Sequence, residues 1–577
     1  MADATPPGAN VRTRVQEYGG AAYLVSRGVI YYSELSDQRL YRLKPGGVSE
    51  SMTPSGDWFY ADATIDRTHE RLVCVREDHT VPGREAQTAL VLLPLDARAA
   101  VPQVIASGYD FYSSPRFSPD GAQLAWLAWR HPQMPWDGTE LWLADVAPSG
   151  ELERSRLIAG GDAESIGQPG WSPDGALHFV SDRTGWWNLY RVRGDITEAV
   201  YPIDAECGRP QWTLGTTTWT FAGPSTLVVA CAEQGTWRLL GFTPRVGGPL
   251  TPADRRLLTD MEPGELLAAT AAHVVFIGGS SGTHDAVLRI DLATGRTEPL
   301  RSASTDPVNL DVLSLPEAIE FPTEGGRTAH AFFYPPRNAA FAAPDGERPP
   351  LIVVSHGGPT AAATGRFNLE IQFWTSRGFA VVDVNYGGSS GFGRAYRERL
   401  NGQWGVVDVD DCVNAARYLA AKGFVDGARL IIRGRSAGGY TTLAALAFRP
   451  DVFKAGASYY GVGDLELLAH DTHKFESRYL DRLVGPYPAS RDLYRARSPI
   501  HHADRLSCPV IFFQGLDDRV VPPEQAENMA AAVRAKGLKV SLVTFAGEAH
   551  GFRRADTILR CLEEEAGFYG SVLKLQF

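Results

Sequence analysis

The sequence lacks the features that mark membrane, secreted and metal-binding proteins. No apolar run approaches the ~18 to 20 residues that a membrane-spanning helix needs, and the opening residues 1–12 contain neither a basic nor an apolar segment of a secretory signal. The six cysteines stand singly, with no CxxC pair. We therefore expect a cytoplasmic protein whose cysteines are small, buried and reduced, rather than a disulfide framework or a metal site.

Positive charge is also in short supply. The 56 Lys and Arg residues are outnumbered by 67 Asp and Glu, which gives a formal net charge of −11 with no basic cluster along the chain. Nucleic acids and anionic membranes are therefore poor candidate partners. The histidines show no zinc-ligand spacing, and the adjacent pair His501-His502 would diverge on any regular element. We expect neither a structural metal nor a cofactor.

The N-terminal half contains a repeat. Six short segments share an apolar-x-x-apolar form, and their first residues stand at positions 40, 90, 141, 189, 237 and 287, a period close to ~50. Other strand-like runs lie between them, and Ser-Pro-Asp-Gly turns occur at residues 118–121 and 172–175. A period of this length, built of several strands, predicts a β-propeller with about six visible blades, with an irregular β-sandwich as the alternative.

Beyond residue 302 the sequence pattern changes from short strand-like repeats to alternating strand-like and helix-like stretches. A transition rich in Pro, Gly and Ala covers residues 312–350, and apolar strand runs then alternate with amphipathic stretches such as 409–421 and 524–536. The predicted strands are Leu351–Val354, Phe379–Val384, Leu430–Ile432, Val510–Phe513 and Val540–Phe545. Strands that are apolar on both faces predict a mostly parallel sheet covered by helices. We expect a propeller domain with its N-terminal segment and linker at 1–311, and an α/β domain at 312–577.

Three serines lie in a Gly-x-Ser-x-Gly pattern, which is weak evidence by itself. Ser280 lies in the propeller half and is expected in a turn, and Ser389 is followed by further glycines, so we expect a loop serine there. Ser436 differs, because a strand at 429–433 precedes it and a helix-forming stretch, 441–448, follows. Strand, tight turn and helix form the nucleophile elbow of α/β-hydrolases, which presents Oγ at a helix N-terminus.

A serine nucleophile needs a base and an acid, which in this fold follow it in the order acid, then histidine. His550, after the strand run at 540–545, is the last histidine of the chain and has the required position. The acid should follow the run at 510–513, where Asp517 and Asp518 are adjacent, and spacing alone does not separate them. For the oxyanion, the expected N–H donors are Ala437 and the glycine-rich loop at 355–359.

With these residues in place, the chain resembles the prolyl oligopeptidase superfamily, and most closely its acylaminoacyl-peptidase and dipeptidyl-aminopeptidase-like bacterial branch. The motifs span 312–577 and comprise His356-Gly357-Gly358-Pro359, Asn385-Tyr386-Gly387-Gly388-Ser389, Trp404-Gly405 with Asp408-Val409-Asp410-Asp411, Ser436-Ala437-Gly438-Gly439-Tyr440, Asp517-Asp518-Arg519-Val520-Val521-Pro522 and Ala549-His550-Gly551-Phe552. Six repeats are visible, whereas relatives usually have seven blades.

The resemblance implies a role for each matched position. Ser436 would be the nucleophile, His550 the general base and Asp517 the orienting acid. Gly358 and Ala437 would donate to the oxyanion, and Arg519 would bind a substrate carbonyl. The propeller would cap the α/β-hydrolase domain and exclude folded proteins.

The predicted function is therefore a serine peptidase that hydrolyses short peptides, as an exopeptidase or an acylaminoacyl or dipeptidyl type, through an acyl-enzyme. One alternative is an esterase or amidase that acts on a small acylated metabolite, and another is a non-catalytic propeller interaction protein. Glu164 and Glu206 are candidates for binding a substrate amine, and Arg183 for a substrate carboxylate. A homo-oligomer is left open.

Overall fold

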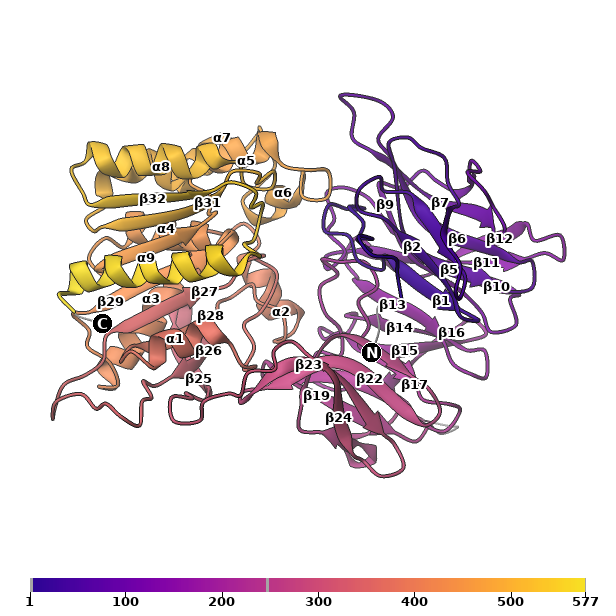
Figure 1. Ribbon diagram of the computed structural model, residues 1–577, viewed down its shortest axis with the longest axis horizontal. Coiled ribbons are helices and arrows are strands. Elements are labelled where there is room, and N and C mark those ends of the chain that lie inside the picture. Colours follow the sequence, from indigo (N-terminus) through magenta and orange to yellow (C-terminus); the bar gives the residue numbers. More distant parts are fainter. Residues whose placement is uncertain (1–3, 245–247, 576–577) are drawn as a thin grey trace. The chain divides into compact units, whose positions relative to one another are not determined.

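The computed structural model describes residues 4–244 and 248–575 and divides into two compact units (Figure 1). The main division lies between Leu300 and Arg301, and two short stretches, Gln234–Thr236 and Gly279–Ala286, also group with the second unit. The sequence placed the boundary later, between 311 and 312. Residues 301–311 group with the second unit, where the Ala339 N–H donates to the Asp311 carbonyl at 2.9 Å.

Within its described residues, the first unit contains six four-stranded sheets, the blades of a β-propeller. The blades are β1 (Tyr23–Ser26), β2 (Val29–Ser33), β3 (Leu40–Leu43) and β4 (Ser49–Ser51); β5 (Trp58–Asp66), β6 (Arg71–Asp78), β7 (Gln87–Pro94) and β8 (Gln103–Ala106); β9 (Phe111–Phe117), β10 (Gln123–Trp129), β11 (Thr139–Val146) and β12 (Leu152–Gly161); β13 (Ile166–Trp171), β14 (Leu177–Ser181), β15 (Asn188–Arg193) and β16 (Ile196–Tyr201); β17 (Trp219–Phe221), β18 (Leu227–Glu233), β19 (Thr236–Phe242) and β20 (Arg256–Thr259); β21 (Glu262–Ala269), β22 (His273–Ser280), β23 (Thr283–Asp291) and β24 (Thr297–Ser302). The predicted propeller and its six blades are confirmed, and the sandwich is excluded.

Each repeat segment lies on the third strand of its blade: β3, β7, β11, β15, β19 and β23. This strand is interior to its sheet, and its apolar side chains pack on the adjacent blade. Leu141 and Leu143 of β11, for example, share one buried cluster with Phe179 of the following blade. The repeat in the sequence therefore reflects the packing of each blade against its neighbour.

The second unit is built on one eight-stranded sheet, ordered β25-β26-β28-β27-β29-β30-β31-β32. The strands are β25 (Glu317–Thr323), β26 (Arg327–Tyr334), β27 (Leu351–Ser355), β28 (Ala380–Asn385), β29 (Leu430–Arg435), β30 (Ala455–Tyr459), β31 (Val510–Gly515) and β32 (Val540–Phe545). From β28 to β32 the neighbouring strands are parallel, and β25 and β26 add an antiparallel edge. The predicted α/β-hydrolase sheet is confirmed, including each strand expected from an apolar run.

Helices cover both faces of this sheet. They are α1 (Leu369–Thr375), α2 (Arg394–Arg397), α3 (Val407–Ala421), α4 (Ala437–Phe448), α5 (Leu465–Asp471), α6 (Tyr479–Leu483), α7 (Arg491–Arg497), α8 (Pro523–Ala535) and α9 (Ala555–Leu573). Trp374 of α1 and Tyr569 of α9 share one buried cluster with Ile431 of β29, so α1 and α9 lie on the same face. Figure 1 shows α9 running across the front of the sheet, and α3, α4 and α8 pack against its strands as well.

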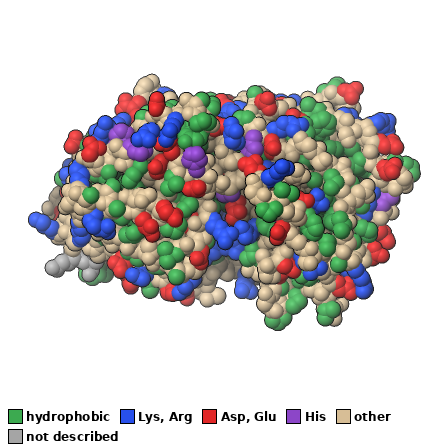
Figure 2. Space-filling model, turned by 90° about the horizontal axis from the view of Figure 1, so that it is seen from above, with side chains coloured by type: hydrophobic (Ala, Val, Ile, Leu, Met, Phe, Trp, Pro, Cys, Tyr) green, Lys and Arg blue, Asp and Glu red, His purple; other side chains and the backbone are tan. Residues whose placement is uncertain are grey.

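The surface mixes charges of both signs. On the face shown in Figure 2, acidic and basic side chains are interspersed among apolar and neutral ones. Among the helices of the described residues, none is both long and apolar enough to cross a membrane.

Candidate active site

The sharp turn between β29 and α4 carries Ser436. Its φ of +52° and ψ of −120° put a non-glycine residue in a strained region of backbone conformation. The turn is possible because glycines flank it: a Cβ on Gly434 would lie 2.1 Å from the Gly438 carbonyl oxygen, and a Cβ on Gly438 would lie 2.0 Å from the Ser355 carbonyl oxygen. The strand, turn and helix expected around Ser436 are thus present.

Two hydrogen bonds connect Ser436 through a histidine to a carboxylate. His550 Nε2 lies 2.8 Å from Ser436 Oγ, and His550 Nδ1 lies 2.8 Å from Asp518 Oδ2. The Asp518 carboxylate is buried, and its other oxygen accepts the backbone N–H groups of Val520 and Val521, both at 2.9 Å. An ionised carboxylate can only accept, so Nδ1 carries the proton and Nε2 is left to take one from Ser436.

The prediction that Asp517 is the acid is wrong. Asp517 is exposed, and its backbone N–H donates to the Glu548 carbonyl at 3.0 Å, which fixes the turn with the Asp517 side chain facing solvent. Asp518, one residue later, points inward to His550. No local signal separates the two residues, because each is followed two and three positions later by residues with a backbone N–H. Only the path of the turn directs the N–H groups of Val520 and Val521 to Asp518. Arg519 is exposed, and in the described residues it forms no ion pair with Asp518.

The loop after β27 lies against the Ser436 turn. A Cβ on Gly357 would lie 3.6 Å from the Ser436 Cβ, and Gly358, with φ +118°, lines the same pocket as Ser436 and Ala437. Ala437 is the first residue of α4, where a helix has no internal partner for its N–H. In the part of the chain that the structure describes, neither the Gly358 nor the Ala437 N–H donates to another protein group. Both are therefore available to an oxyanion.

The other two Gly-x-Ser-x-Gly serines have different surroundings. Ser280 is the last residue of β22, next to the turn into β23, and it hydrogen-bonds the Thr283 hydroxyl at 2.9 Å. Ser389 is fully buried in the loop after β28, and its Oγ lies 2.7 Å from Nε2 of His356, in the glycine-rich loop. His356 Nδ1 lies 2.8 Å from the Gly357 carbonyl oxygen.

A network of ion pairs lies at the end of β29, the strand that leads into the Ser436 turn. Glu370 pairs with Arg433 at 3.3 Å and also with Arg435, the residue before the nucleophile candidate. Arg433 pairs in addition with Glu565 of α9 at 3.0 Å. Although burial opposes ionisation, the neighbouring arginines hold the pKa of Glu370 below its usual value. These charged residues come from three separate elements, α1, β29 and α9, so no local sequence pattern connects them.

An apolar pocket opens beside Ser436. Its lining includes Gly358, Pro359, Trp404, Ser436, Ala437, Val462, Leu468, Thr472, Glu476, Tyr479, Leu480, Leu483, Val520 and Val521. Much of this wall comes from α5, α6 and the loop between them. Most of the lining side chains are apolar, and Glu476 is the acidic residue of the lining.

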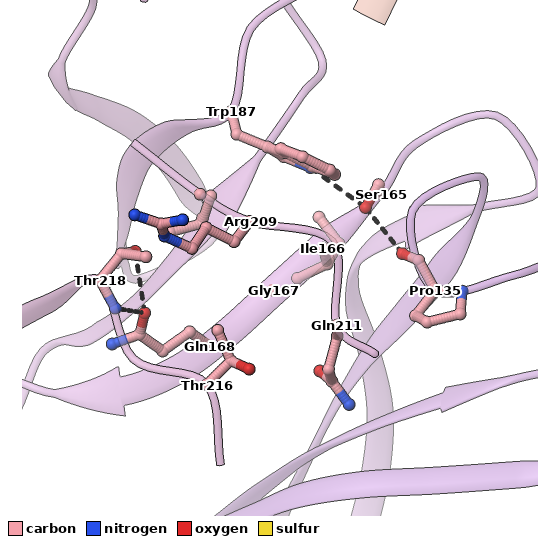
Figure 3. Close-up of a pocket in the computed structure, with 12 residues that line it drawn as sticks. Pro135, Ser165, Ile166, Gly167, Gln168, Trp187, Arg209, Gln211, Thr216 and Thr218 are labelled. Atoms are coloured by element: carbon pink, nitrogen blue, oxygen red, sulfur yellow. Dashed lines mark hydrogen bonds between the residues drawn. The ribbon is translucent and has the colours of Figure 1, made fainter. Parts of the chain in front are cut away.

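A second pocket, with several polar side chains in its lining, lies in the propeller unit (Figure 3). Gln168 Oε1 accepts the Thr218 N–H at 2.6 Å, and the Trp187 indole donates to Ser165 Oγ at 3.1 Å. Arg209 and Gln211 complete the group of polar side chains around this pocket.

The acidic candidates of the propeller are engaged in its structure. Glu164 pairs with Arg183 at 2.8 Å, and the buried Glu206 accepts the Trp187 backbone N–H at 2.8 Å. Next to Glu206, Cys207 forms a disulfide with Cys231, with an S–S distance of 2.09 Å. The expectation that all cysteines are reduced is therefore wrong for this pair. The two residues lie beside the backbone bridge between Glu206 and Ala232, which brings them together although they are 24 residues apart.

Comparison with known proteins gives matches in the second unit and over the whole chain. Residues 365–576 match the profile described as the prolyl oligopeptidase family. Dipeptidyl aminopeptidase BIII of Pseudoxanthomonas mexicana is 30% identical over 246 residues, which cover 41% of this chain and 36% of that protein. Acylamino-acid-releasing enzyme 1 of rice (Oryza sativa) is 30% identical over 211 residues, 35% of this chain and 27% of that protein. The match thus spans about a third of these curated relatives.

Two solved structures match over nearly their full length. A puromycin-hydrolyzing peptidase of Mycobacterium tuberculosis is 42% identical, with a TM-score of 0.94, and the match covers 100% of this chain and 90% of that chain. A puromycin hydrolase is 38% identical, with a TM-score of 0.91, and the match covers 99% of this chain and 89% of that chain.

Proposed function

Because the chain belongs to the prolyl oligopeptidase family, we propose that it is a serine peptidase that hydrolyses short peptides and aminoacyl amides through an acyl-enzyme on Ser436. One observation carries the proposal: Ser436 Oγ, the His550 ring and the Asp518 carboxylate form a continuous chain with two hydrogen bonds of 2.8 Å. This is the arrangement of nucleophile, base and orienting acid that acyl transfer requires.

The first half of the reaction forms the acyl-enzyme. Ser436 Oγ attacks the scissile carbonyl carbon while its proton passes to His550 Nε2, and the Asp518 carboxylate stabilises the resulting imidazolium. The carbonyl oxygen becomes an oxyanion, which the N–H groups of Gly358 and Ala437 bind. His550 then gives the proton to the leaving amine as the C–N bond breaks.

The second half releases the acid. A water molecule takes the place of the departed amine, His550 removes its proton, and the hydroxide attacks the ester carbonyl. The same two N–H groups bind the second oxyanion. As the ester bond breaks, His550 returns the proton to Ser436 Oγ, which restores the starting state.

For the substrate, we propose a residue with an apolar or aromatic side chain on the acyl side of the cleaved bond. The pocket beside Ser436 is walled by Trp404, Leu480, Val521 and similar side chains, which favour apolar groups. Puromycin, an amide between an aromatic amino acid and an aminonucleoside, has this chemistry, and the two full-length structural relatives are described as hydrolysing it. A substrate of this kind contains an amide bond that a peptidase or an amidase would cleave, so the proposal covers both of these alternatives.

Two charged side chains are proposed as substrate contacts. Glu476 lines the apolar pocket and supplies the charge expected for a free α-ammonium group. Arg519 is exposed beside the buried Asp518, which leaves its guanidinium available for a substrate carbonyl. We expect Glu476→Gln to raise KM for free-amine substrates alone, and Arg519→Gln to raise KM for all substrates.

The proposal is tested with a matched panel of chromogenic amides that carry the same aromatic residue. The panel comprises the free aminoacyl amide, its N-acyl form, a dipeptidyl amide, the corresponding ester and puromycin, whose aminonucleoside product is followed by mass spectrometry. We expect hydrolysis of the free aminoacyl amide and of puromycin by the wild-type protein and none by Ser436→Ala. Ester hydrolysis without amide hydrolysis would overturn the peptidase proposal.

Location and assembly are also proposals. We propose a cytoplasmic enzyme that can form homo-oligomers. The Cys207–Cys231 disulfide argues against this location, because disulfides persist mainly in oxidising compartments. Alkylation of free thiols in the native cell, followed by mass spectrometry, would find both cysteines alkylated in a reducing compartment. A protected pair would contradict the cytoplasmic location.

A further inference from the structure

Ser389 and His356 form a buried pair that the proposed reaction does not use. Ser389 has no exposed surface, and its Oγ lies 2.7 Å from His356 Nε2. The His356 ring stacks on Tyr386 at a centroid distance of 4.3 Å and an interplanar angle of 17°, and the Tyr386 hydroxyl donates to the His356 carbonyl at 3.0 Å. The ring is therefore held in one orientation.

The hydrogen bonds of this pair run in one direction. His356 Nδ1 lies 2.8 Å from the Gly357 carbonyl oxygen, which can only accept, so Nδ1 must carry a proton. Burial lowers the pKa of His356 to about 4, so the ring is neutral at pH 7 and Nε2 has a lone pair. Ser389 therefore donates its O–H to Nε2, and His356 donates its Nδ1–H to the Gly357 carbonyl.

The Gly357 carbonyl belongs to the same planar peptide group as the Gly358 N–H. A hydrogen bond to the oxygen of an amide draws electron density from its nitrogen, which makes the N–H more positive and a stronger donor. It also fixes the plane of the peptide, and thereby the direction in which the N–H points. Both effects favour an oxyanion donor that must be in place before charge develops.

We propose that Ser389 and His356 are positioning residues, whose hydrogen-bond chain orients and polarises the Gly357–Gly358 peptide that binds the oxyanion. The inference rests on the proposed function, because it assigns the Gly358 N–H to the acyl-transfer transition state. Ser389 thereby acts through His356 and never touches the substrate.

The first test replaces the donor of the chain. In Ser389→Ala, His356 Nε2 has no donor, so the preference for the Nδ1–H form weakens. We expect kcat to fall about tenfold, less than the ~10² to 10³ lost when a whole oxyanion donor is removed, with KM changed less than about twofold. The matched control is Ser390→Ala, which removes a hydroxyl from the next buried serine and should leave kcat unchanged.

A second readout separates positioning from a general structural role. The affinity for a peptide aldehyde, which forms a tetrahedral adduct, should fall in Ser389→Ala by the same factor as kcat/KM. Substrate affinity, measured in the Ser436→Ala background, should not change when Ser389→Ala is added. In wild-type protein, ¹⁵N NMR of His356 should show a protonated Nδ1 and an unprotonated Nε2.

A double-mutant cycle tests whether the two residues act as one chain. His356→Phe keeps the stacking on Tyr386 but has no N–H for Gly357, and adding Ser389→Ala to it should cause no further loss of kcat. Additive losses, an equal loss in Ser390→Ala or an unchanged kcat in Ser389→Ala would each overturn the inference. Full activity in Ser436→Ala would instead overturn the proposed function, so the two failures are distinguishable.

Discussion

Two serines of this chain lie in the same short motif, follow strands of the same sheet and hydrogen-bond a histidine. Ser389 follows β28 and lies 2.7 Å from His356, whereas Ser436 follows β29 and lies 2.8 Å from His550. The loops differ in what comes next: Ser436 opens the helix α4, and Ser389 leads into more glycines. Ser389 is fully buried, and Ser436 is only partly so and lines a pocket.

The difference shows what a serine–histidine hydrogen bond needs before it supports catalysis. Behind His550 is the carboxylate of Asp518, which stabilises a positive ring, and behind His356 is the neutral carbonyl of Gly357. Burial without a compensating charge keeps the pKa of His356 at about 4, so this ring cannot serve as a base at neutral pH. Access to the substrate and a charged partner distinguish the two serines, and the motif does not.

The largest expected effect comes from removing the hydroxyl of Ser436. We expect Ser436→Ala to lose several orders of magnitude in kcat, with a residual acceleration of ~10³ to 10⁴ over water from the oxyanion donors and binding. Its circular dichroism and thermal midpoint should match the wild type. Turnover at the wild-type rate would mean that the chemistry lies elsewhere.

The second-largest effect on kcat is expected at the adjacent carboxylates Asp517 and Asp518. Asp518→Asn should lower kcat by on the order of 10³ to 10⁴, because an amide at this place favours the wrong tautomer of His550. Asp517→Asn is the matched control and should change kcat less than about threefold, since its side chain is exposed. Steady-state kinetics on one chromogenic amide measure both, and the reverse ranking would restore Asp517 as the acid.

A smaller effect is the pH dependence of folding stability that arises from the protonation of His356. An unfolded histidine has a pKa of ~6.5, and burial lowers that of folded His356 to about 4. As pH falls from 6.5 towards 4, the unfolded chain binds a proton that the folded chain does not, so stability is lost over this window and is fully present above it. At ~1.4 kcal/mol per unit, the loss reaches up to about 3 kcal/mol.

This dependence can be measured with one variant. The thermal midpoint of His356→Phe, relative to the wild type, should rise as pH is lowered from 7 to 4, because the variant has no group to protonate there. His178, whose pKa burial also lowers to about 4, lies in the propeller and is unchanged in both proteins. A midpoint difference that is the same at pH 7 and pH 4 would show that His356 is not buried in its neutral form.

The smallest effect is expected for the third serine of the set. Ser280 ends β22, where it hydrogen-bonds Thr283 and, among the described residues, no histidine, so Ser280→Ala should change neither kcat nor KM by more than about twofold. A large loss of kcat in this variant would show that the surroundings of a serine do not decide which Gly-x-Ser-x-Gly serine takes part in catalysis.

Periodicity in the sequence predicted most of the fold. The six repeat segments occur because the third strand of each blade packs against a neighbouring blade, and this packing requires apolar residues at fixed spacing. The parallel strands were equally clear in the sequence, because burial on both faces leaves an uninterrupted apolar run, as in Leu351–Val354. Ser436 and His550 followed from strand order and motif context.

The remaining features depend on contacts that a local pattern does not contain. Asp517 and Asp518 share the same neighbours in sequence, and only the path of the turn decides which faces His550. The disulfide joins cysteines 24 residues apart. They are brought together by a backbone β-bridge between Glu206 and Ala232, which no sequence motif predicts. Much of the wall of the apolar pocket comes from α5, α6 and their loop, and these short helices carry no strong periodicity.

The most direct test of the comparison is covalent labelling with a fluorophosphonate, which reacts with a serine only when a base activates it. The wild-type protein is labelled at pH 7.5, digested, and the modified peptide is located by mass spectrometry. Ser436 should carry the label, Ser389 and Ser280 should carry none, and Ser436→Ala should not react. A label on Ser389, or an unreactive wild-type protein, would contradict the assignment of Ser436 as the activated serine.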